Sequence, residues 1–222
     1  PSSSDNDFTF ATLPNGVRVV AIPEPHRHTA HVSVFVRTGS AHESRALNGA
    51  SHFVEHMLFK GTRERDVHRI NLDAERLGAE VNAHTDKDHT AFYMRGLGAH
   101  AAPFVRMLAD IVQNPTFPEA ELEREREVLL NEHTEVEDDP MSTAYELFDH
   151  ACYGLHPAAQ QVIGSRRNIE RLSRAELDGY FRRQYTGANL IVAATGPIDP
   201  DVIVHEVQAA FGSLAQEVMN AG

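Results

Sequence analysis

The sequence predicts an α+β fold in which helices pack on a mainly antiparallel β-sheet. Two pairs of apolar segments are each joined by a short polar turn, which is the pattern of β-hairpins. Helical and extended segments do not alternate strictly along the chain, which disfavours a parallel βαβ arrangement. Apolar residues make up 41% of the 222 residues, enough for the core of one domain. We place that domain at residues 8–222 and expect the polar residues 1–7 to be disordered.

The strands are predicted from apolar or alternating runs that are separated by turn residues. Asn15-Gly16, between two apolar runs, is the strongest short hairpin signal in the chain. Further along, Val32, Val34 and Val36 occupy every second position, so they point to one face of a strand. The predicted strands cover residues 8–13, 17–22, 30–37, 80–85, 90–97 and 190–194.

The helices are predicted from apolar residues that recur every three or four positions and from residues that begin or end helices. Gly78 ends the second helix, and Asp138-Asp139-Pro140 separates two later ones. Ser173 and Glu176 form a capping box, and Asp199-Pro200 begins the last helix. The predicted helices cover residues 48–59, 66–77, 99–113, 118–136, 142–152, 173–184 and 199–211.

The segment from His52 to His56 reads H-x-x-E-H, which is the motif H-E-x-x-H in reverse. On a helix, His52 and His56 lie one turn apart on one face, and Glu55 lies on the same side. Two imidazoles and a carboxylate on one face suit a divalent metal ion with a base beside it. The motif therefore predicts a metal site on this helix.

A catalytic zinc site usually has three protein ligands, so a third ligand must come from another segment. The glutamate-rich helix over residues 118–136 is the candidate, although most of its carboxylates are expected to form a solvated face. Glu125 and Glu132 are seven positions apart and share one face, separated by ~10 Å along the axis. One of them can bind a metal ion while the other supports a ligand. This spacing selects the pair without deciding which member is the ligand.

These features resemble the inverzincin zinc peptidases of the pitrilysin and mitochondrial processing peptidase type. The similarity is carried by Gly49–Thr62, by Glu132 at 76 residues beyond His56, and by a second glutamate seven residues earlier, Glu125. Weaker matches extend it over roughly residues 8–214 and lie at residues 81–85, 89–93, 135–140, 162–165 and 196–200. The resemblance implies a half-clamshell domain of the N-terminal, metal-binding type.

The resemblance also implies a zinc-dependent endopeptidase that hydrolyses peptides or unfolded protein segments. His52, His56 and Glu132 would hold one Zn²⁺ per chain, which would lower the pKa of its bound water, the nucleophile, toward ~7. Glu55 would act as the general base and later deliver the proton to the leaving amine. Glu125 would orient a ligand histidine.

The peptide substrate is expected to bind as an added β-strand along Asn82, Ala83, His84 and Thr85. Members of this group usually work as two similar domains, in one chain or in two. This chain has the length of one such domain, so we expect a second homologous domain or subunit. A homodimer, a heterodimer and a fragment of a longer protein all remain open.

Two other functional classes are considered. The chain could be a non-catalytic peptide-binding or structural subunit, although an intact motif argues against it. A metal lyase with H-x-x-E-H would take a cysteine as its third ligand, and Cys152 is the single cysteine in the sequence. Four further histidines are interpreted as surface or hydrogen-bonded side chains rather than ligands: His84, His89, His133 and His150.

Composition excludes several classes of partner. The net charge of −12 argues against a nucleic-acid surface and makes basic peptides a hypothesis for the substrate. No apolar run approaches ~20 residues, so no membrane span is expected. With one cysteine and no visible signal peptide, the expected location is the cytoplasm.

Overall fold

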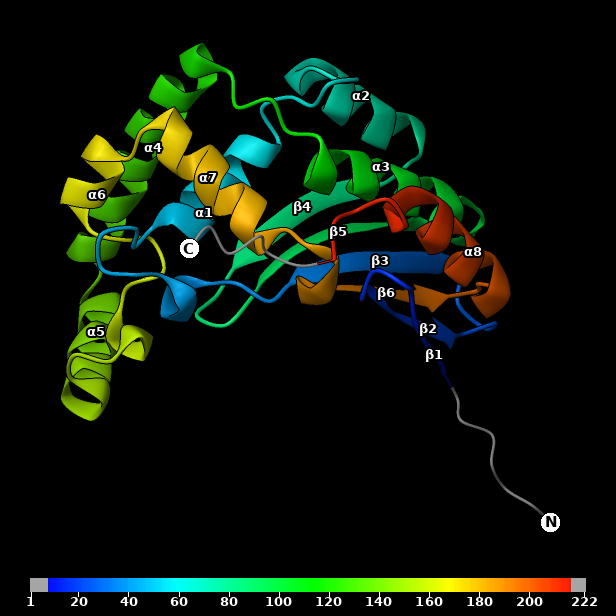
Figure 1. Cartoon of the computed structure of the whole chain (residues 1–222), viewed down its shortest axis with the longest axis horizontal. Helices are drawn as coiled ribbons and strands as arrows, with labels where there is room; N and C mark the ends of the chain where they lie inside the picture. The colour runs from blue at the N-terminus through cyan, green and yellow to red at the C-terminus, as the bar shows by residue number, and fades with distance from the viewer. Residues whose placement is uncertain (1–7, 217–222) are drawn as a thin grey trace.

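The computed structural model describes residues 8–216, and the predicted disorder of residues 1–7 lies outside them. Six strands form one sheet in the order β1-β2-β6-β3-β5-β4 (Figure 1). All neighbouring strands are antiparallel except β2 and β6, which run parallel. The predicted α+β fold with a mainly antiparallel sheet is therefore confirmed. The strands are β1 (Thr9–Thr12), β2 (Arg18–Pro23), β3 (Thr29–Val36), β4 (Glu80–Thr85), β5 (Thr90–Leu97) and β6 (Leu190–Gly196).

Both predicted hairpins form, β1 with β2 and β4 with β5. Gly16 in the first turn has a φ of 88°, a conformation that glycine adopts without steric cost. The alternation in β3 decides which of its side chains face the core: Val32, Val34 and Val36 are fully buried. β3 pairs with β5 on one side and with β6 on the other, so it lies in the interior of the sheet.

The helices divide into two groups (Figure 1). α3 packs on β3 and β5, and α8 packs on β2 and on α3. The second group includes α4 and α7. α1 contacts both of them and also contacts β4, the strand at the end of the sheet. The helices are α1 (Ala50–Leu58), α2 (Val67–Arg76), α3 (Ala101–Gln113), α4 (Glu119–Asp138), α5 (Pro140–Tyr153), α6 (Arg166–Arg171), α7 (Arg174–Gln184) and α8 (Pro200–Phe211). Single 3₁₀ turns lie at Ser40–His42, Gly98–His100, Pro157–Ala159 and Gly187–Asn189.

The helix ends differ from the predictions by a few residues, and for two helices the local cause is clear. α1 begins at Ala50 rather than residue 48, because Gly49 is left-handed with a φ of 98°. α5 begins at Pro140 rather than residue 142, because the Asp139 side chain accepts hydrogen bonds from the first N–H groups of that helix. The short helix α6 was not predicted, since its six residues are too few to show a period. In the described residues, none of the helices combines the length and apolar sequence needed to cross a bilayer.

Candidate metal centre

α1 turns one side to the core and the other to α4. Phe53, Met57 and Leu58 are buried in the core, and burial of each such side chain is worth about 1.5–3 kcal/mol. His52 and His56 lie one turn apart on the remaining side, with ring centroids separated by 4.7 Å. The packing of α1 therefore fixes the direction in which both imidazoles point.

The N-terminus of α1 is anchored by Glu43, a buried residue of the preceding loop. Its carboxylate accepts hydrogen bonds from the N–H groups of Gly49 at 2.8 Å and Ser51 at 2.6 Å, and from the Asn48 amide at 3.1 Å. Burial raises the pKa of Glu43, although these hydrogen bonds oppose the shift. The sequence analysis missed this residue, because no local pattern links a loop carboxylate to the helix that it caps.

Tyr180 of α7 fixes the same end of the helix. Its hydroxyl lies 2.7 Å from the Ser51 hydroxyl and 2.7 Å from the Thr38 hydroxyl. Burial, followed by the neighbouring Glu43, raises the pKa of Tyr180 to about 12, so the hydroxyl keeps its proton. α1 is thus held by polar contacts at its start and by apolar packing along its length.

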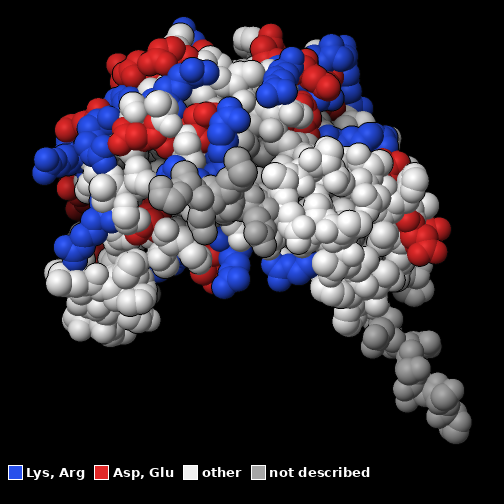
Figure 2. Space-filling view, viewed as in Figure 1, with Lys and Arg blue, Asp and Glu red and all other residues white. Residues whose placement is uncertain are grey.

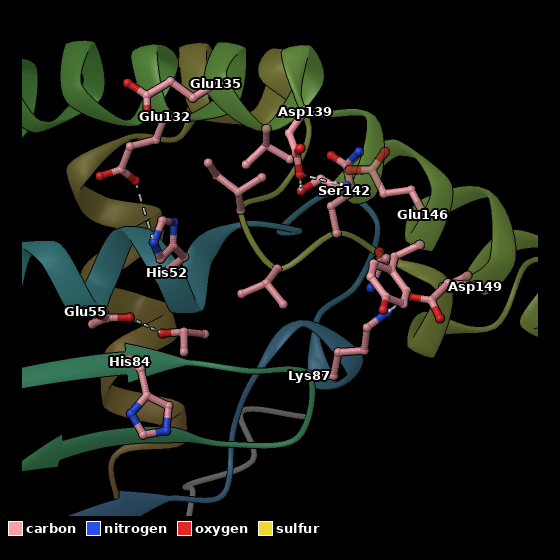
Figure 3. A pocket seen from close by; sticks show the side chains of 18 of the residues that line it. His52, Glu55, His84, Lys87, Glu132, Glu135, Asp139, Ser142, Glu146 and Asp149 are labelled. Atoms are coloured by element: carbon pink, nitrogen blue, oxygen red, sulfur yellow. Dashed lines mark hydrogen bonds and ion pairs between the residues drawn. The ribbon is translucent and has the colours of Figure 1, made fainter.

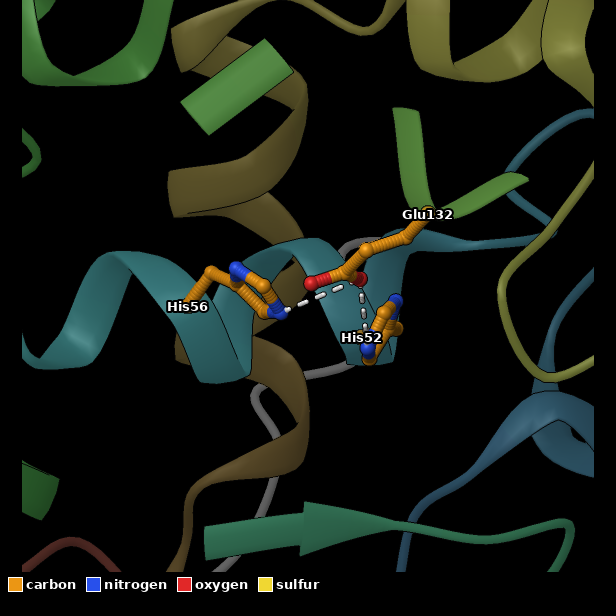
Figure 4. Close-up of side chains that lie close together, drawn as sticks. All are labelled: His52, His56 and Glu132. Carbon is orange, nitrogen blue, oxygen red and sulfur yellow. Dashed lines mark ion pairs between the residues drawn. The ribbon is translucent and has the colours of Figure 1, made fainter. Parts of the chain in front are cut away.

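The structure brings His52 and His56 together with Glu132, which lies on α4 (Figure 4). Glu132 Oε2 lies 3.8 Å from His52 Nε2 and 3.7 Å from His56 Nε2. One possible ligand atom from each residue lies within 4.8 Å of the other two. These separations are longer than hydrogen bonds and leave room for an ion, since zinc binds nitrogen and oxygen at about 2.0–2.2 Å.

His52 is suited to bind a cation because it stays neutral. Burial, followed by the neighbouring His56, lowers the pKa of His52 to about 3. Its Nδ1 is buried and has no hydrogen-bond partner among the described residues. The unprotonated ring can therefore offer a lone pair at neutral pH without first losing a proton.

Glu125 takes the other position of the predicted pair. Its Oε2 accepts a hydrogen bond from His56 Nδ1 at 3.0 Å, and its Oε1 lies 2.7 Å from the ammonium group of Lys60. Although burial alone would raise the pKa of Glu125, the hydrogen bonds from His56 and Lys60 lower it. Burial likewise opposes the shift of His56, but Glu125 and the nearby carboxylates raise the pKa of that ring. Lys60 was not predicted from the sequence, although it lies four residues beyond His56, in the turn that follows α1.

Glu55 is buried on the side of α1 that faces β4. Its Oε2 accepts a hydrogen bond of 2.5 Å from the hydroxyl of Thr85, the last residue of β4 (Figure 3). Burial raises the pKa of Glu55, and the charge of Glu132 adds to the shift. A carboxylate with a raised pKa, next to a metal site, is suited to accept and donate protons near neutral pH.

A cavity of about 730 Å³ opens beside the three candidate ligands and extends between β4 and α5 (Figure 3). The ammonium group of Lys87 lies at its wall, 2.5 Å from Asp149 Oδ2 and 2.7 Å from the carbonyl oxygen of Ala158. Among the charged side chains that line this cavity, Lys87 is the single lysine and the acidic residues are Glu55, Glu132, Glu135, Asp139, Glu146 and Asp149.

The residues predicted to bind substrate lie on the strand at the end of the sheet. Ala83, His84 and Thr85 line the cavity, whereas Asn82 is exposed and is not among its lining residues. β4 pairs only with β5 in the described sheet, so its other edge is free there. Cys152 is exposed on α5 and does not join the three candidate ligands, which removes the support for the lyase alternative.

Comparison with known proteins identifies relatives that match most of this chain. A zinc protease of Mycobacterium tuberculosis, itself described as uncharacterised, is 39% identical over 202 residues, which cover 91% of this chain and 46% of the relative. The mitochondrial-processing peptidase subunit beta of Lentinula edodes is 32% identical over 205 residues, covering 92% of this chain and 44% of the relative. The chain thus spans about half the length of these curated relatives.

The fold is also found in a solved structure, a protease from Helicobacter pylori. It superimposes with a TM-score of 0.90 over 96% of this chain and 52% of that chain. The two sequences are 24% identical, so this likeness shows the fold alone. Residues 18–166 match the family described as insulinase, peptidase family M16. The chain belongs to peptidase family M16.

Proposed function

We propose that this chain is the metal-binding domain of a zinc-dependent endopeptidase. The observation that carries the proposal is the convergence of His52, His56 and Glu132, with Glu55 beside them. The donor set fits zinc, because two imidazoles and one carboxylate are common zinc ligands and leave further coordination positions open. When bound, the ion supplies Lewis acidity that polarises a peptide carbonyl and makes water more acidic.

The chain's own residues supply the remaining chemistry. Glu55, with its raised pKa, takes a proton from the attacking water and delivers it to the leaving amine. Thr85 orients that carboxylate through its hydrogen bond and ties it to β4. Glu125 holds the His56 ring by its Nδ1 atom, which keeps Nε2 directed toward Glu132.

The substrate is proposed to bind as an extra strand beside β4, at the edge of the sheet that has no partner in the described residues. Main-chain hydrogen bonds at a sheet edge depend little on side chains, so a sequence-tolerant peptidase can use them. The acidic lining of the cavity supports a preference for basic side chains near the scissile bond. This preference predicts faster cleavage of basic than of acidic peptides, with a rate that falls as salt increases.

A second homologous domain or subunit is proposed to complete the enzyme. The chain spans about half of the relatives named above. α5 borders the cavity and exposes Tyr145, Leu147 and Phe148 to 65%, 66% and 63%. Figure 2 shows few charged side chains over the lower left of the molecule, where α5 lies in Figure 1. An apolar surface beside a cavity is suited to contact a second protein surface.

The proposed function is tested by Glu55→Gln, with Glu127→Gln as the matched control. Glu127 is an exposed residue of α4, so its change should leave activity and zinc binding as they are. Cleavage of a basic, unstructured peptide is measured with zinc content, for the chain alone and for the chain joined to its second domain or subunit. Glu55→Gln is expected to lower kcat about 10²–10⁴-fold while keeping zinc.

Two outcomes would contradict this function. Cleavage that is unchanged in Glu55→Gln would show that another group is the base. Zinc binding without cleavage in the complete assembly would instead favour a non-catalytic peptide-binding or structural subunit.

A further inference from the structure

A second pair of histidines lies where β4 turns into β5. His84 is on β4 and His89 is the last residue before β5. Their Nε2 atoms are 3.2 Å apart, and the two rings are perpendicular with centroids separated by 5.3 Å. The Nε2 atoms of the two rings therefore face each other across the turn.

The other ring nitrogen of His89 is already used. His89 Nδ1 lies 2.7 Å from Asp88 Oδ1 and donates its hydrogen to that carboxylate. In the neutral ring this leaves Nε2 unprotonated, so it offers a lone pair. A carboxylate on the far nitrogen is the arrangement that orients metal-binding histidines in proteins and raises their basicity.

The spacing of the two nitrogens matches what a metal ion requires. Two bonds of about 2.0–2.1 Å at a tetrahedral angle place their nitrogen atoms about 3.3 Å apart. The neutral His84 ring can carry its hydrogen on Nδ1 instead of Nε2, so both Nε2 atoms become available without any change in charge. We propose that His84 and His89, contrary to their interpretation from the sequence as surface or hydrogen-bonded side chains, form a second binding site for a divalent late transition ion such as Zn²⁺, with water completing the coordination.

The surroundings of the pair support a cation. Asp86 and Asp88 lie in the same turn, while the ammonium group of Lys87 is bound to Asp149 and to the Ala158 carbonyl group. Lys87, the only lysine of this turn, is thus paired with groups that lie outside the turn. The ring of His89 also packs against Phe35 at a centroid distance of 5.9 Å, which limits its freedom.

This site is distinct from the first one. Successive side chains of a strand point to opposite faces, so His84 and Thr85 diverge. Thr85 contacts Glu55, whereas His84 lies on the other side of β4 (Figure 3). An ion here would link β4 to the start of β5 and stiffen the strand on which the peptide is proposed to bind. Two protein ligands bind more weakly than three, so the second ion should be lost first.

The experiment is a zinc titration of the folded protein without an affinity tag, with a competing chelator and elemental analysis. The wild-type protein is expected to bind a tight and a weaker equivalent. His84→Ala and His89→Ala should each lose the weaker one, and Asp88→Asn should weaken it about 10-fold. His150→Ala is the control for an exposed histidine, on α5, and should keep both.

The two sites can be separated in the same titration. In His56→Ala the tight equivalent should weaken, while the weaker one persists and disappears only when His89→Ala is added. A weaker equivalent that persists in both His84→Ala and His89→Ala would overturn the proposal. So would a wild-type protein that binds no more zinc than those two variants. Neither result depends on peptidase activity.

Discussion

Replacement of Glu125 by glutamine should weaken zinc binding without removing a zinc ligand. Glu125 is 8% exposed, accepts the His56 Nδ1 hydrogen at 3.0 Å and carries a charge that Lys60 stabilises at 2.7 Å. Glutamine keeps an acceptor but loses the charge, which turns a charge-assisted hydrogen bond into a neutral one. Loss of such a partner of a ligand histidine typically costs 10–100-fold in affinity, or about 1.4–2.7 kcal/mol.

The size of this loss should depend on pH. The hydrogen bond to Glu125 raises the pKa of His56 in the wild-type protein, although burial opposes it. Below that raised pKa, zinc must displace a proton from the wild-type ring, which offsets part of the advantage of the carboxylate. The zinc dissociation constant of Glu125→Gln, divided by that of the wild-type protein, should therefore be larger at pH 8 than at pH 6.

The assay is competition with a chelator of known affinity, on protein shown to be folded by circular dichroism. Glu127→Gln, an exposed change two residues along α4, provides the control and should bind zinc as the wild-type protein does. An affinity for Glu125→Gln within twofold of wild type at pH 8 would refute the reasoning. An equal loss in Glu127→Gln would refute it as well, because the effect would then follow from the charge of α4 in general.

Three further predictions concern the elements that support the site. Glu43→Ala should lower the free energy of unfolding by about 3 kcal/mol in urea denaturation, since two buried N–H groups at the start of α1 lose their acceptor; a loss below about 1 kcal/mol would contradict the anchoring role. Gly164→Ala should cost at least about 2 kcal/mol, because φ is +84° and the new Cβ would lie 2.5 Å from Gly49 Cα; Gly154→Ala, also at positive φ but with open space around it, should cost less. The pKa of Glu176 is lowered to about 2, first by the Ser173 N–H, so its stabilising effect is present above pH 4.5 and is lost as the pH falls toward 2. Glu176→Gln should thus destabilise by up to about 1 kcal/mol at pH 7, a value limited by solvent screening because the side chain is 38% exposed, and by much less at pH 2; an equal difference at both pH values would exclude this linkage.

Local sequence patterns were sufficient to predict features that lie within one segment of the chain. The turn at Asn15-Gly16 and the capping box of Ser173 and Glu176 are both present. The spacing of His52 and His56 correctly places both on one side of α1, because helical geometry alone decides it. The single parallel pair, β2 with β6, was not predicted, since strand order depends on contacts between distant segments.

Tertiary packing decides what the sequence left open at the site. The spacing selected Glu125 and Glu132 equally, and the way α4 crosses α1 gives them different partners. Between them, Val128 is 40% exposed while Leu129 is 1% exposed, so Leu129 is the apolar residue that α4 buries there. Glu43 and Tyr180 act on the site from other segments, and nothing in their neighbouring residues indicates that role.

The central claim is that His52, His56 and Glu132 together hold one zinc ion. It is tested most directly by an anomalous difference map at the zinc absorption edge, from crystals of protein loaded with one equivalent of Zn²⁺. We predict one dominant peak enclosed by the two Nε2 atoms and the Glu132 carboxylate. A map whose dominant peak lies elsewhere, or that has no peak among these three side chains, would contradict the account.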